Sequence, residues 1–318
     1  MQVYRGHERV PAWREGTAVA IGNFDGVHLG HRALIARARA LATAHDAQVV
    51  ALTFDPHPST LFATTPPPMV SSLARRIELL GEAGADAVVV EPFTRALAAA
   101  APHAFIDDIV IHALCARAIV VGYDFSYGQG RTGTTDALVA HGGRAGVEVA
   151  IVAAVAEGGE VASSTRIREH LRAGELAAAE RLLGRRWDVD GTVVHGAKRG
   201  RAIGIPTANI RPESDLPLRP GIYAVTLAVE GGTHRPAVAS LGTNPTFVEH
   251  GGGLVLEVHV LDVDLATFDI YDKRTRTTFV QHLRDEAKFE SVEVLVEQIH
   301  ADIDAARRAV VPSSEARK

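Results

Sequence analysis

The stretch Gly22-Asn23-Phe24-Asp25-Gly26-Val27-His28-Leu29-Gly30-His31 decides how the first half of this chain folds. The apolar residues 17–21 before it have the composition of a buried strand. After it, apolar residues recur at helical spacing through residues 34–41. The decapeptide is therefore predicted to turn from a strand into a helix within an α/β unit, where the helix offers unpaired N–H groups to an anionic ligand.

Two histidines of this stretch carry its predicted chemistry. His28 and His31 lie three residues apart, which places both imidazoles at the mouth of the predicted helix, where positive or hydrogen-donating rings suit a phosphate. Gly22, Gly26 and Gly30 remove Cβ atoms where a nucleotide would approach the backbone. The alternative is a tight turn with surface histidines. A metal site is less favoured, because no carboxylate or cysteine joins the histidines at ligand spacing.

Composition limits the class of protein. A chain of 318 residues is long enough for two domains, and 47% apolar with 22% charged residues is an ordinary globular balance. The net charge of −5 argues against nucleic-acid binding, and the single Cys115 fits a reducing compartment. The polar N-terminus lacks the apolar core of a signal peptide, and no apolar run reaches membrane-spanning length. We expect a cytoplasmic protein without membrane or nucleic-acid partners; oligomerisation stays open.

The rest of the first half alternates between strand and helix patterns. Helical patterns at 73–80 and 103–115 separate apolar runs that read as strands. The further predicted strands are residues 48–54, 87–90, 118–121 and 148–153. This alternation predicts a parallel sheet with helices on both faces.

The predicted strand 48–54 ends in Phe54-Asp55-Pro56-His57-Pro58. Its two prolines fix a rigid extended path, so the side chains of Phe54 and His57 are held in place. An aromatic residue at the carboxyl edge of a sheet could hold a flat ring, although a loop that merely ends a strand is the alternative.

Two further segments follow strand ends. Residues 122–133 carry aromatic residues, glycines and an arginine. We expect Phe125 to face away from Tyr123 and Tyr127. Residues 163–168, Ser-Ser-Thr-Arg-Ile-Arg, precede an apolar-periodic run and fit a helix N-cap. Capping does not explain Arg168 in the first turn, where the helix dipole disfavours a cation, so this arginine suggests an anionic ligand.

The pattern changes after residue 185. Short alternating strands with glycine-bearing turns follow, which predicts a small β-barrel. Among these predicted strands are residues 191–194, 221–229, 236–241, 254–261 and 277–280. Residues 291–308 form one amphipathic helix that we expect to pack against the barrel, and residues 310–318 are expected to be disordered.

The predicted barrel carries its own candidate chemistry. Residues 195–204 hold three glycines and three basic residues, which suits a polyphosphate but also fits a solvated basic turn. Thr207 and Asn209 lie two apart and offer two neutral oxygens on one side of an extended segment, as Mg²⁺ sites can use. Glu257 is either part of a polar face in water or a general base for phosphoryl transfer.

The first half resembles the nucleotidyltransferase superfamily, in the form found in bacterial bifunctional riboflavin kinase/FAD synthetases. The resemblance rests on Gly22–His31, Phe54–Pro58, Gly122–Gly128 and Ser163–Arg168, in the family's order. It implies a Rossmann-like FMN adenylyltransferase domain over residues 1–185, with His28 and His31 catalytic. ATP would be bound by Gly22, Phe24, Asp25, Gly26, His28, His31, Ser164, Thr165 and Arg168. FMN would be bound by Asn23, Phe54, Pro56, His57, Pro58, Asp124 and Phe125.

The second half resembles the riboflavin kinase of the same family. The matching segments are Gly191–Gly196, Gly200–Asn209, Gly221–Ala224, Leu241–Phe247 and Arg284–Phe289, with Glu257. The resemblance implies a kinase β-barrel over residues 186–318, with Glu257 as catalytic base and Thr207 and Asn209 as ligands of Mg²⁺. ATP would be bound by Gly196, Lys198, Gly200, Arg201, Gly204, Thr207 and Asn209. The flavin would be bordered by Arg284, Glu286 and Phe289.

Together these resemblances imply an enzyme that phosphorylates riboflavin to FMN and adenylylates FMN to FAD, with ATP as co-substrate, Mg²⁺ as cofactor and small molecules as partners. Two alternatives are an adenylyltransferase with another phosphate acceptor and a flavin-binding protein without activity. One departure concerns the kinase. After Asp262 the family has a glycine-containing turn, whereas residues 263–271 here are longer and lack that glycine.

Overall fold

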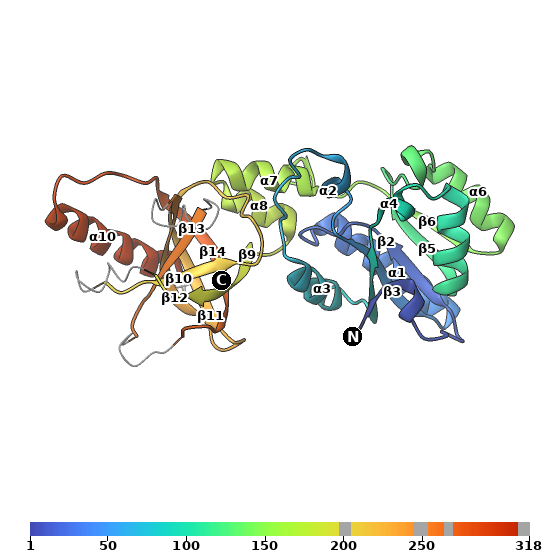
Figure 1. Ribbon diagram of the computed structural model, residues 1–318, viewed down its shortest axis with the longest axis horizontal. Helices are drawn as coiled ribbons and strands as arrows, with labels where there is room; N and C mark the ends of the chain where they lie inside the picture. Colours follow the sequence, from blue (N-terminus) through green and yellow to red (C-terminus); the bar gives the residue numbers. More distant parts are fainter. Residues whose placement is uncertain (197–204, 244–253, 264–269, 311–318) are drawn as a thin grey trace, which may run out of the picture. The chain divides into compact units, whose positions relative to one another are not determined.

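The computed structural model describes residues 1–196, 205–243, 254–263 and 270–310 (Figure 1). The chain forms two compact units, of which the first comprises Met1–Pro67 and Leu73–Ser164 and the second Pro68–Ser72 and Thr165–Lys318. The predicted functional boundary at residue 185 follows the change in sequence pattern. The packing boundary lies earlier, because the helices before residue 185 pack with the second unit.

The first unit is built on a six-stranded sheet with the order β1-β4-β3-β2-β5-β6, in which every neighbouring pair is parallel. The strands are β1 (Gln2–Arg5), β2 (Thr17–Ile21), β3 (Gln48–Asp55), β4 (Ala87–Pro92), β5 (Ala116–Gly122) and β6 (Glu148–Val152). The four interior strands read as apolar runs because helices cover both of their faces. The predicted parallel sheet is thus confirmed.

Alternate residues of the sheet enter two separate cores. Ala18 and Ala20 of β2 pack with Leu34 and Ile35 of the first helix. Val19 and Ile21 of β2 face the other way, into a cluster that holds Ile106 and Ile109. The helical segments of this unit are η1 (His7–Arg9), α1 (Leu29–His45), α2 (Ser59–Phe62), α3 (Leu73–Glu82), α4 (Arg95–Ala98), α5 (Pro102–Ala104), the π-helix η2 (Phe105–Ala113), η3 (Gln129–Arg131) and α6 (Thr135–Ala145).

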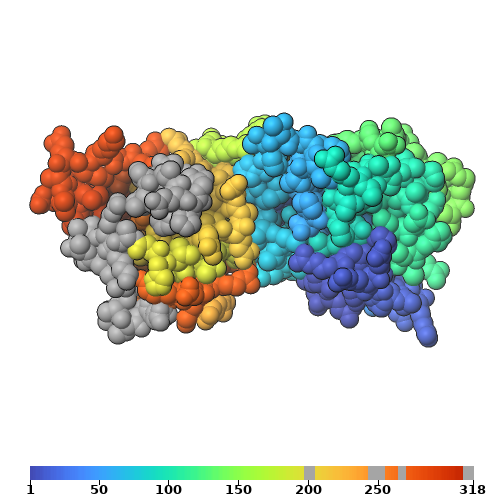
Figure 2. Space-filling model, viewed as in Figure 1, coloured from blue at the N-terminus to red at the C-terminus, as the bar shows by residue number. Residues whose placement is uncertain are grey.

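The surface of the first unit includes its N-terminal edge. The edge strand β1 and the short η1 are largely exposed and appear dark blue in Figure 2. A two-stranded ribbon of β7 (Ala156–Glu157) and β8 (Glu160–Val161) precedes the last helices. Among the helices that the structure describes, none combines the length and the apolar character that a membrane span requires.

The second unit is a closed antiparallel barrel with the order β10-β13-β12-β11-β14-β9, followed by a C-terminal helix (Figure 1). The strands are β9 (Asp188–Val194), β10 (Ala208–Pro212), β11 (Gly221–Val229), β12 (Arg235–Thr243), β13 (Leu254–Val260) and β14 (Arg274–Arg284). The helices are α7 (Ser164–Ala173), α8 (Leu176–Leu183) and α10 (Val292–Val310). The predicted barrel and terminal helix are both confirmed.

Helices cover the barrel through short apolar contacts. Ile303 and Ala306 of α10 pack against Ala224 of β11 and Leu261 after β13. The indole of Trp187 is buried at the start of the barrel, where its Nε1 donates a hydrogen bond to the carbonyl of Val70, 2.8 Å away. The hydrogen bond from Trp187 to Val70 connects residues 68–72 to the barrel, in agreement with their place in this unit.

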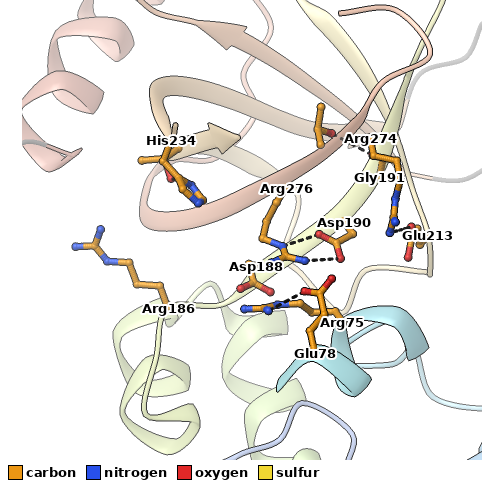
Figure 3. A network of polar contacts seen from close by, with 12 residues as sticks. Arg75, Glu78, Arg186, Asp188, Asp190, Gly191, Glu213, His234, Arg274 and Arg276 are labelled. Atoms are coloured by element: carbon orange, nitrogen blue, oxygen red, sulfur yellow. Dashed lines mark hydrogen bonds and ion pairs between the residues drawn. The ribbon is translucent and has the colours of Figure 1, made fainter. Parts of the chain in front are cut away.

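A buried ion pair joins two adjacent barrel strands. Asp190 of β9 and Arg276 of β14 are cross-strand partners, and the guanidinium donates to both carboxylate oxygens, at 2.7 and 3.0 Å (Figure 3). The Asp190 side chain is only 5% exposed. The pair therefore satisfies a carboxylate that would otherwise be buried without a counter-charge.

Removing the cation of this pair should destabilise the barrel. We expect Arg276→Ala to lower the free energy of unfolding by roughly 3 kcal/mol, since Asp190 is then buried without its partner. Arg274 of the same strand pairs with Glu213 at 2.8 Å but is 61% exposed, so Arg274→Ala should cost under about 1 kcal/mol. Urea denaturation followed by tryptophan fluorescence compares the two variants; equal losses would contradict this account of the buried pair.

Candidate functional site

The carboxyl ends of three strands define the candidate site of the first unit. The chain proceeds from β2 to β3 and β4 on one side and then crosses to β5 on the other side of β2. Ligands of open α/β sheets bind beyond the strands at such a switch point. The stretch Gly22–His31 follows β2, residues 56–58 follow β3 and residues 123–125 follow β5. The fold therefore brings three of the predicted motifs to one edge of the sheet.

The turn between β2 and α1 has an unusual backbone. Phe24 and Val27 have φ of 53° and 43°, and Gly26 has φ of 79°. Gly26 adopts this left-handed conformation without strain, whereas Phe24 and Val27 hold it although their Cβ atoms make it costly. Phe24 is fully buried, and its ring contacts the ring of His31 edge-on, with centroids 5.2 Å apart. Phe24, which we predicted to contact ATP, therefore supports the imidazole of His31 from beneath.

His28 and His31 lie together at the start of α1, as predicted. Their rings stack with centroids 3.7 Å apart and an interplanar angle of 23°. His28 occupies the N-cap position, yet its imidazole makes no capping hydrogen bond to the described residues of α1. The Nδ1 atom of each ring is buried and has no hydrogen-bond partner in the described part of the chain. Two imidazole nitrogens are thus left available where the helix presents free N–H groups.

Both histidines are held in the neutral form. Burial lowers the pKa of His28 from 6.5 to about 4. The pKa of His31 is lowered by burial first, and then by the charges of His28 and Arg76. At neutral pH these rings can donate hydrogen bonds but carry no charge. The sequence allowed either charged or neutral, hydrogen-donating imidazoles. The structure favours the neutral imidazoles in the free protein.

The lowered pKa of His28 makes folding depend on pH. Between pH 6.5 and about 4 the unfolded chain binds a proton at His28 that the folded chain does not, so stability is lost as the pH falls through this window. The full contribution is about 3 kcal/mol. We expect His28→Asn to flatten this part of the stability profile, measured by urea denaturation between pH 4 and 8. An unchanged pH dependence in the variant would contradict the neutral assignment.

The predicted motif at 163–168 reaches the same turn through its serine. The hydroxyl of Ser164 donates a hydrogen bond to the carbonyl of Asp25 over 2.9 Å, which ties the first residue of α7 to the β2–α1 turn. Thr165 is exposed and belongs to the second unit. Arg168 is buried there, and its Nε donates to the carbonyl of Pro68 over 2.9 Å. This contact gives the first-turn arginine a structural partner in addition to any ligand.

The residues predicted to bind FMN take different positions. Phe54 is buried. The centroid of its ring lies 5.6 Å from the ring centroid of Phe93 and 6.2 Å from that of Phe105. The ring of His57 accepts a hydrogen bond at Nδ1 from the backbone N–H of Ser59, which orients it at the start of α2. Pro56 and Pro58 flank His57 in the turn, as the sequence predicts.

The turn after β5 corrects one expectation. We expected Phe125 to face away from Tyr127, but their rings stack with centroids 5.4 Å apart and an interplanar angle of 17°. Residues 123 and 124 form a turn, and in the extended chain that follows it residues two apart share a side, so Phe125 and Tyr127 lie together. Asp124 is exposed beside this aromatic pair.

The sequence did not reveal Arg76 of α3, which lies near the same strand ends. Its side chain is 2% exposed, and its Nη1 donates to the hydroxyl of Thr53 at 3.4 Å and to the carbonyl of Phe54 at 3.2 Å. A signal was present, because residue 76 follows Leu73 by three and precedes Leu80 by four. An arginine on the apolar stripe of a helix is a candidate for a buried functional charge.

On the barrel, two predicted kinase residues are brought face to face. Asn209 of β10 and Glu257 of β13 are cross-strand partners, so their Cβ atoms lie about 5 Å apart on one face of the sheet. Glu257 also pairs with Ser240 of β12. Leu256 and Val258 are buried, whereas Glu257 is partly exposed, as the predicted alternation requires. The carboxylate thus lies outside the barrel interior and beside an amide.

The predicted phosphate loop begins close to Asn209. A Cβ on Gly196 would lie 2.1 Å from the amide nitrogen of Asn209, so a larger residue there would displace the Asn209 side chain. Thr207 directly precedes β10, and the imidazole Nδ1 of His259 lies 2.8 Å from the carbonyl of Pro206. The remaining predicted loop residues, Lys198, Gly200, Arg201 and Gly204, lie outside the described residues.

The predicted flavin-side residues meet α10. Arg284 donates from Nε and Nη2 to the buried carboxylate of Asp302, at 3.0 and 2.8 Å, and its guanidinium lies 5.6 Å from the ring centroid of Phe289. The carboxylate of Glu286 packs against Gly242, where a Cβ would lie under 2 Å from its Oε1. Arg284 therefore anchors this segment to the C-terminal helix. Residues 264–269 of the altered segment lie outside the described residues.

Within the part of the chain that the structure describes, no three His, Cys, Asp or Glu side chains are grouped so as to hold a metal ion. The Thr207–Asn209 pair offers neutral oxygens instead, beside the single carboxylate of Glu257. Such a donor set fits a hard cation that keeps most of its ligands from water and phosphate, as Mg²⁺ does.

Comparisons with known proteins match both halves of the chain. Residues 10–166 match a family model described as FAD synthetase, and residues 183–310 match one described as riboflavin kinase. Bifunctional riboflavin kinase/FMN adenylyltransferase from Pseudomonas fluorescens is 37% identical over 314 residues, which is 99% of each chain. Its counterpart from Listeria monocytogenes is 39% identical over 288 residues, 89% of each chain.

A solved structure extends the match to the whole fold. A crystal structure from Streptococcus pneumoniae, described as that of a macrolide-efflux protein, superposes with a TM-score of 0.85 at 29% sequence identity. It covers 96% of this chain and 99% of its own. With both family models matched in order and curated relatives aligned over nearly its full length, the chain belongs to the family of bifunctional riboflavin kinase/FMN adenylyltransferases.

Proposed function

We propose that this protein makes FAD from riboflavin in two ATP-dependent steps at two separate sites. Residues 186–318 phosphorylate riboflavin to FMN, and residues 1–185 adenylylate FMN to FAD with release of pyrophosphate. The observation that carries the proposal is the presence of two unrelated constellations. One is the histidine pair at the switch point of the parallel sheet, and the other is the Asn209–Glu257 pair on the barrel.

Adenylyl transfer needs positioning and charge stabilisation rather than a protein nucleophile. The FMN phosphate attacks the α-phosphorus of ATP in line, and pyrophosphate leaves. The free N–H groups of α1 and the neutral rings of His28 and His31 donate hydrogen bonds to the phosphate oxygens as charge builds on them. Ser164 holds the turn through Asp25. Thr165 and Arg168 stay predicted ATP ligands on the sequence resemblance alone.

The flavin is expected beside the ends of β3 and β5. Asn23, Pro56, His57, Pro58, Asp124 and Phe125 are its proposed contacts at the adenylyltransferase site. Phe54 is buried among aromatic rings, so we assign it the support of this wall. The edge-on ring of Phe93 and the tilted ring of Phe105 make this wall rigid, which preserves the position of a bound ring.

Phosphoryl transfer on the barrel uses Glu257 as the base. Its carboxylate accepts the proton of the ribityl 5′-hydroxyl while that oxygen attacks the γ-phosphorus of ATP, the bond to the β,γ-bridging oxygen breaks, and ADP leaves. Thr207 and Asn209 are the proposed ligands of Mg²⁺, which when bound neutralises charge on the phosphates. Gly196, Lys198, Gly200, Arg201 and Gly204 would line the ATP phosphates. Arg284, Glu286 and Phe289 would border the flavin, with Arg284 fixed by Asp302.

Product analysis tests the proposed function. The protein is incubated with riboflavin, ATP and Mg²⁺, and the flavins are separated by chromatography over time. We expect FMN to appear first and FAD to follow, with no FMN when Mg²⁺ is chelated. Absence of both products would reject the proposal, and FMN without FAD would reject its adenylyltransferase half.

We also propose a cytoplasmic location, because both steps consume ATP and the lone Cys115 fits a reducing compartment.

A further inference from the structure

A buried arginine in the first unit has no role in the reaction steps given above. Arg76 lies on α3 and is 2% exposed. Its Nη1 donates to the Thr53 hydroxyl at 3.4 Å and to the Phe54 carbonyl at 3.2 Å, while its Nε is buried with no hydrogen-bond partner among the described residues. A guanidinium stays protonated in proteins and is costly to bury, so a protein keeps one in such a place for a reason.

The neighbouring arginine shows how a buried guanidinium is otherwise accommodated. Arg75 of the same helix is also buried, but it forms ion pairs with Glu78 at 3.0 Å and Glu82 at 2.8 Å. Within the described residues, no carboxylate oxygen lies within 4.0 Å of the Arg76 guanidinium. Asp25 and Asp55 act on it only from a greater distance, by favouring its charged form. The charge of Arg76 is therefore only partly compensated in the free protein.

The contacts of Arg76 connect the two turns that the proposed function uses. The Thr53 hydroxyl accepts from Arg76 and donates to the carbonyl of Asn23 over 3.0 Å. Asn23 belongs to the nucleotide turn after β2, whereas the second acceptor of Arg76, the Phe54 carbonyl, lies near the end of β3 on the flavin side. One guanidinium thus ties the nucleotide turn to the flavin turn.

We propose that Arg76 is a positioning residue of adenylyl transfer, which fixes the nucleotide turn against the flavin-side strand end and supplies a fixed positive charge near the bound phosphates. This inference rests on the proposed function. It accounts for a buried cation without an ion pair, since the anionic substrates complete its environment. It also supplies the charge that the two neutral histidines lack.

The same arrangement predicts an electrostatic effect of the Arg76 charge on His31. The ring of His31 stacks on that of His28, and the charges of His28 and Arg76 act on it, while Asp25 and Asp55 act on Arg76. The charge of Arg76 is one cause of the low pKa of His31. Removing that charge should raise the pKa of His31.

The test compares Arg76→Gln with Arg75→Gln, its buried neighbour on the same helix. For Arg76→Gln we expect kcat/KM of FMN adenylylation to fall about 100-fold, riboflavin phosphorylation to stay unchanged, and the His31 titration followed by NMR to move to higher pH. Arg76→Lys keeps the charge, so it should restore the His31 titration and bring activity to within about 10-fold of wild type. Arg75→Gln should change adenylylation less than about 3-fold.

Two results would overturn the proposal. The first is a folded Arg76→Gln protein that adenylylates FMN at the wild-type rate. If Arg76→Gln does not fold, Thr53→Val is measured instead, because it removes the bridging hydroxyl at nearly constant shape. The second overturning result is adenylylation at the wild-type rate in Thr53→Val, which would refute the link between the two turns. Failure of the proposed function itself would be recognised separately, since wild-type protein would then form no FAD, whereas the His31 titration does not depend on turnover.

Discussion

Glu257→Gln is expected to lower riboflavin phosphorylation about 1000-fold while leaving FMN adenylylation at the wild-type rate. The amide keeps the size of the side chain but cannot accept the proton of the attacking hydroxyl. Glu257 faces Asn209 across β10 and β13, so the lost base lies beside the proposed Mg²⁺ ligands and not in the first unit. Rates of FMN formation from riboflavin and of FAD formation from FMN, measured separately, give the comparison.

A second carboxylate of the barrel provides the matched control. Glu213 pairs with Arg274 (Figure 3), so Glu213→Gln also removes one negative charge from the barrel but should leave phosphorylation within about 2-fold of wild type. Phosphorylation retained in Glu257→Gln would remove Glu257 as the base. Equal losses in both variants would point to a general effect of charge on the barrel.

His31→Gln should have the opposite effect, with FMN adenylylation reduced about 1000-fold and riboflavin phosphorylation unchanged. The imidazole of His31 stacks on His28 and contacts the ring of Phe24 edge-on, so its ring is held in place before any phosphate binds. A flexible amide at this position loses that preorganisation. The assay follows conversion of FMN and ATP to FAD and pyrophosphate.

His45 ends the same helix and serves as the control. Its Nε2 lies 3.1 Å from a carboxylate oxygen of Glu148, away from the turn between β2 and α1. His45→Gln should therefore leave adenylylation within about 2-fold of wild type. The role assigned to His31 would be wrong if its replacement cost no more than that of His45.

The pattern of the sequence was enough to predict both architectures. Residues 221–229 were predicted as a strand and form β11, and the predicted strand at 254–261 forms β13 over Leu254–Val260. These strands are bounded by glycine or charged turns. The predicted alternation survives in the burial of the β13 side chains, whereas β11 is buried at 223–225 and at 227–228 without alternation. In the first half, apolar runs covered on both faces by helices gave an equally clear signal.

Other elements depend on partners far away in the sequence. No strand was predicted for β1, because its residues are largely exposed and it exists by pairing with β4. The role of Arg76 was not predicted, because its two hydrogen-bond acceptors lie on β3, which is far from α3 in the sequence. The attachment of Arg284 to Asp302, and of Arg168 to Pro68, likewise follows from tertiary folding and has no local signature.

The candidate sites were predictable to different degrees. The family resemblance implied the grouping of Gly22–His31 with Ser164, and the structure joins them through the hydrogen bond from Ser164 to Asp25. The neutral state of the histidines did not follow, because it depends on how deeply the folded chain buries their rings. The register that pairs Asn209 with Glu257 is likewise a property of the closed barrel.

Mixing these two variants, each of which lacks one of the two activities, tests most directly whether the chain holds two independent sites. Glu257→Gln and His31→Gln proteins are combined with riboflavin, ATP and Mg²⁺, and the flavins are separated by chromatography. We predict that the mixture forms FMN and then FAD, although neither variant alone converts riboflavin to FAD. If each folded variant has lost both activities and the mixture forms neither FMN nor FAD, the claim of two independent sites is contradicted.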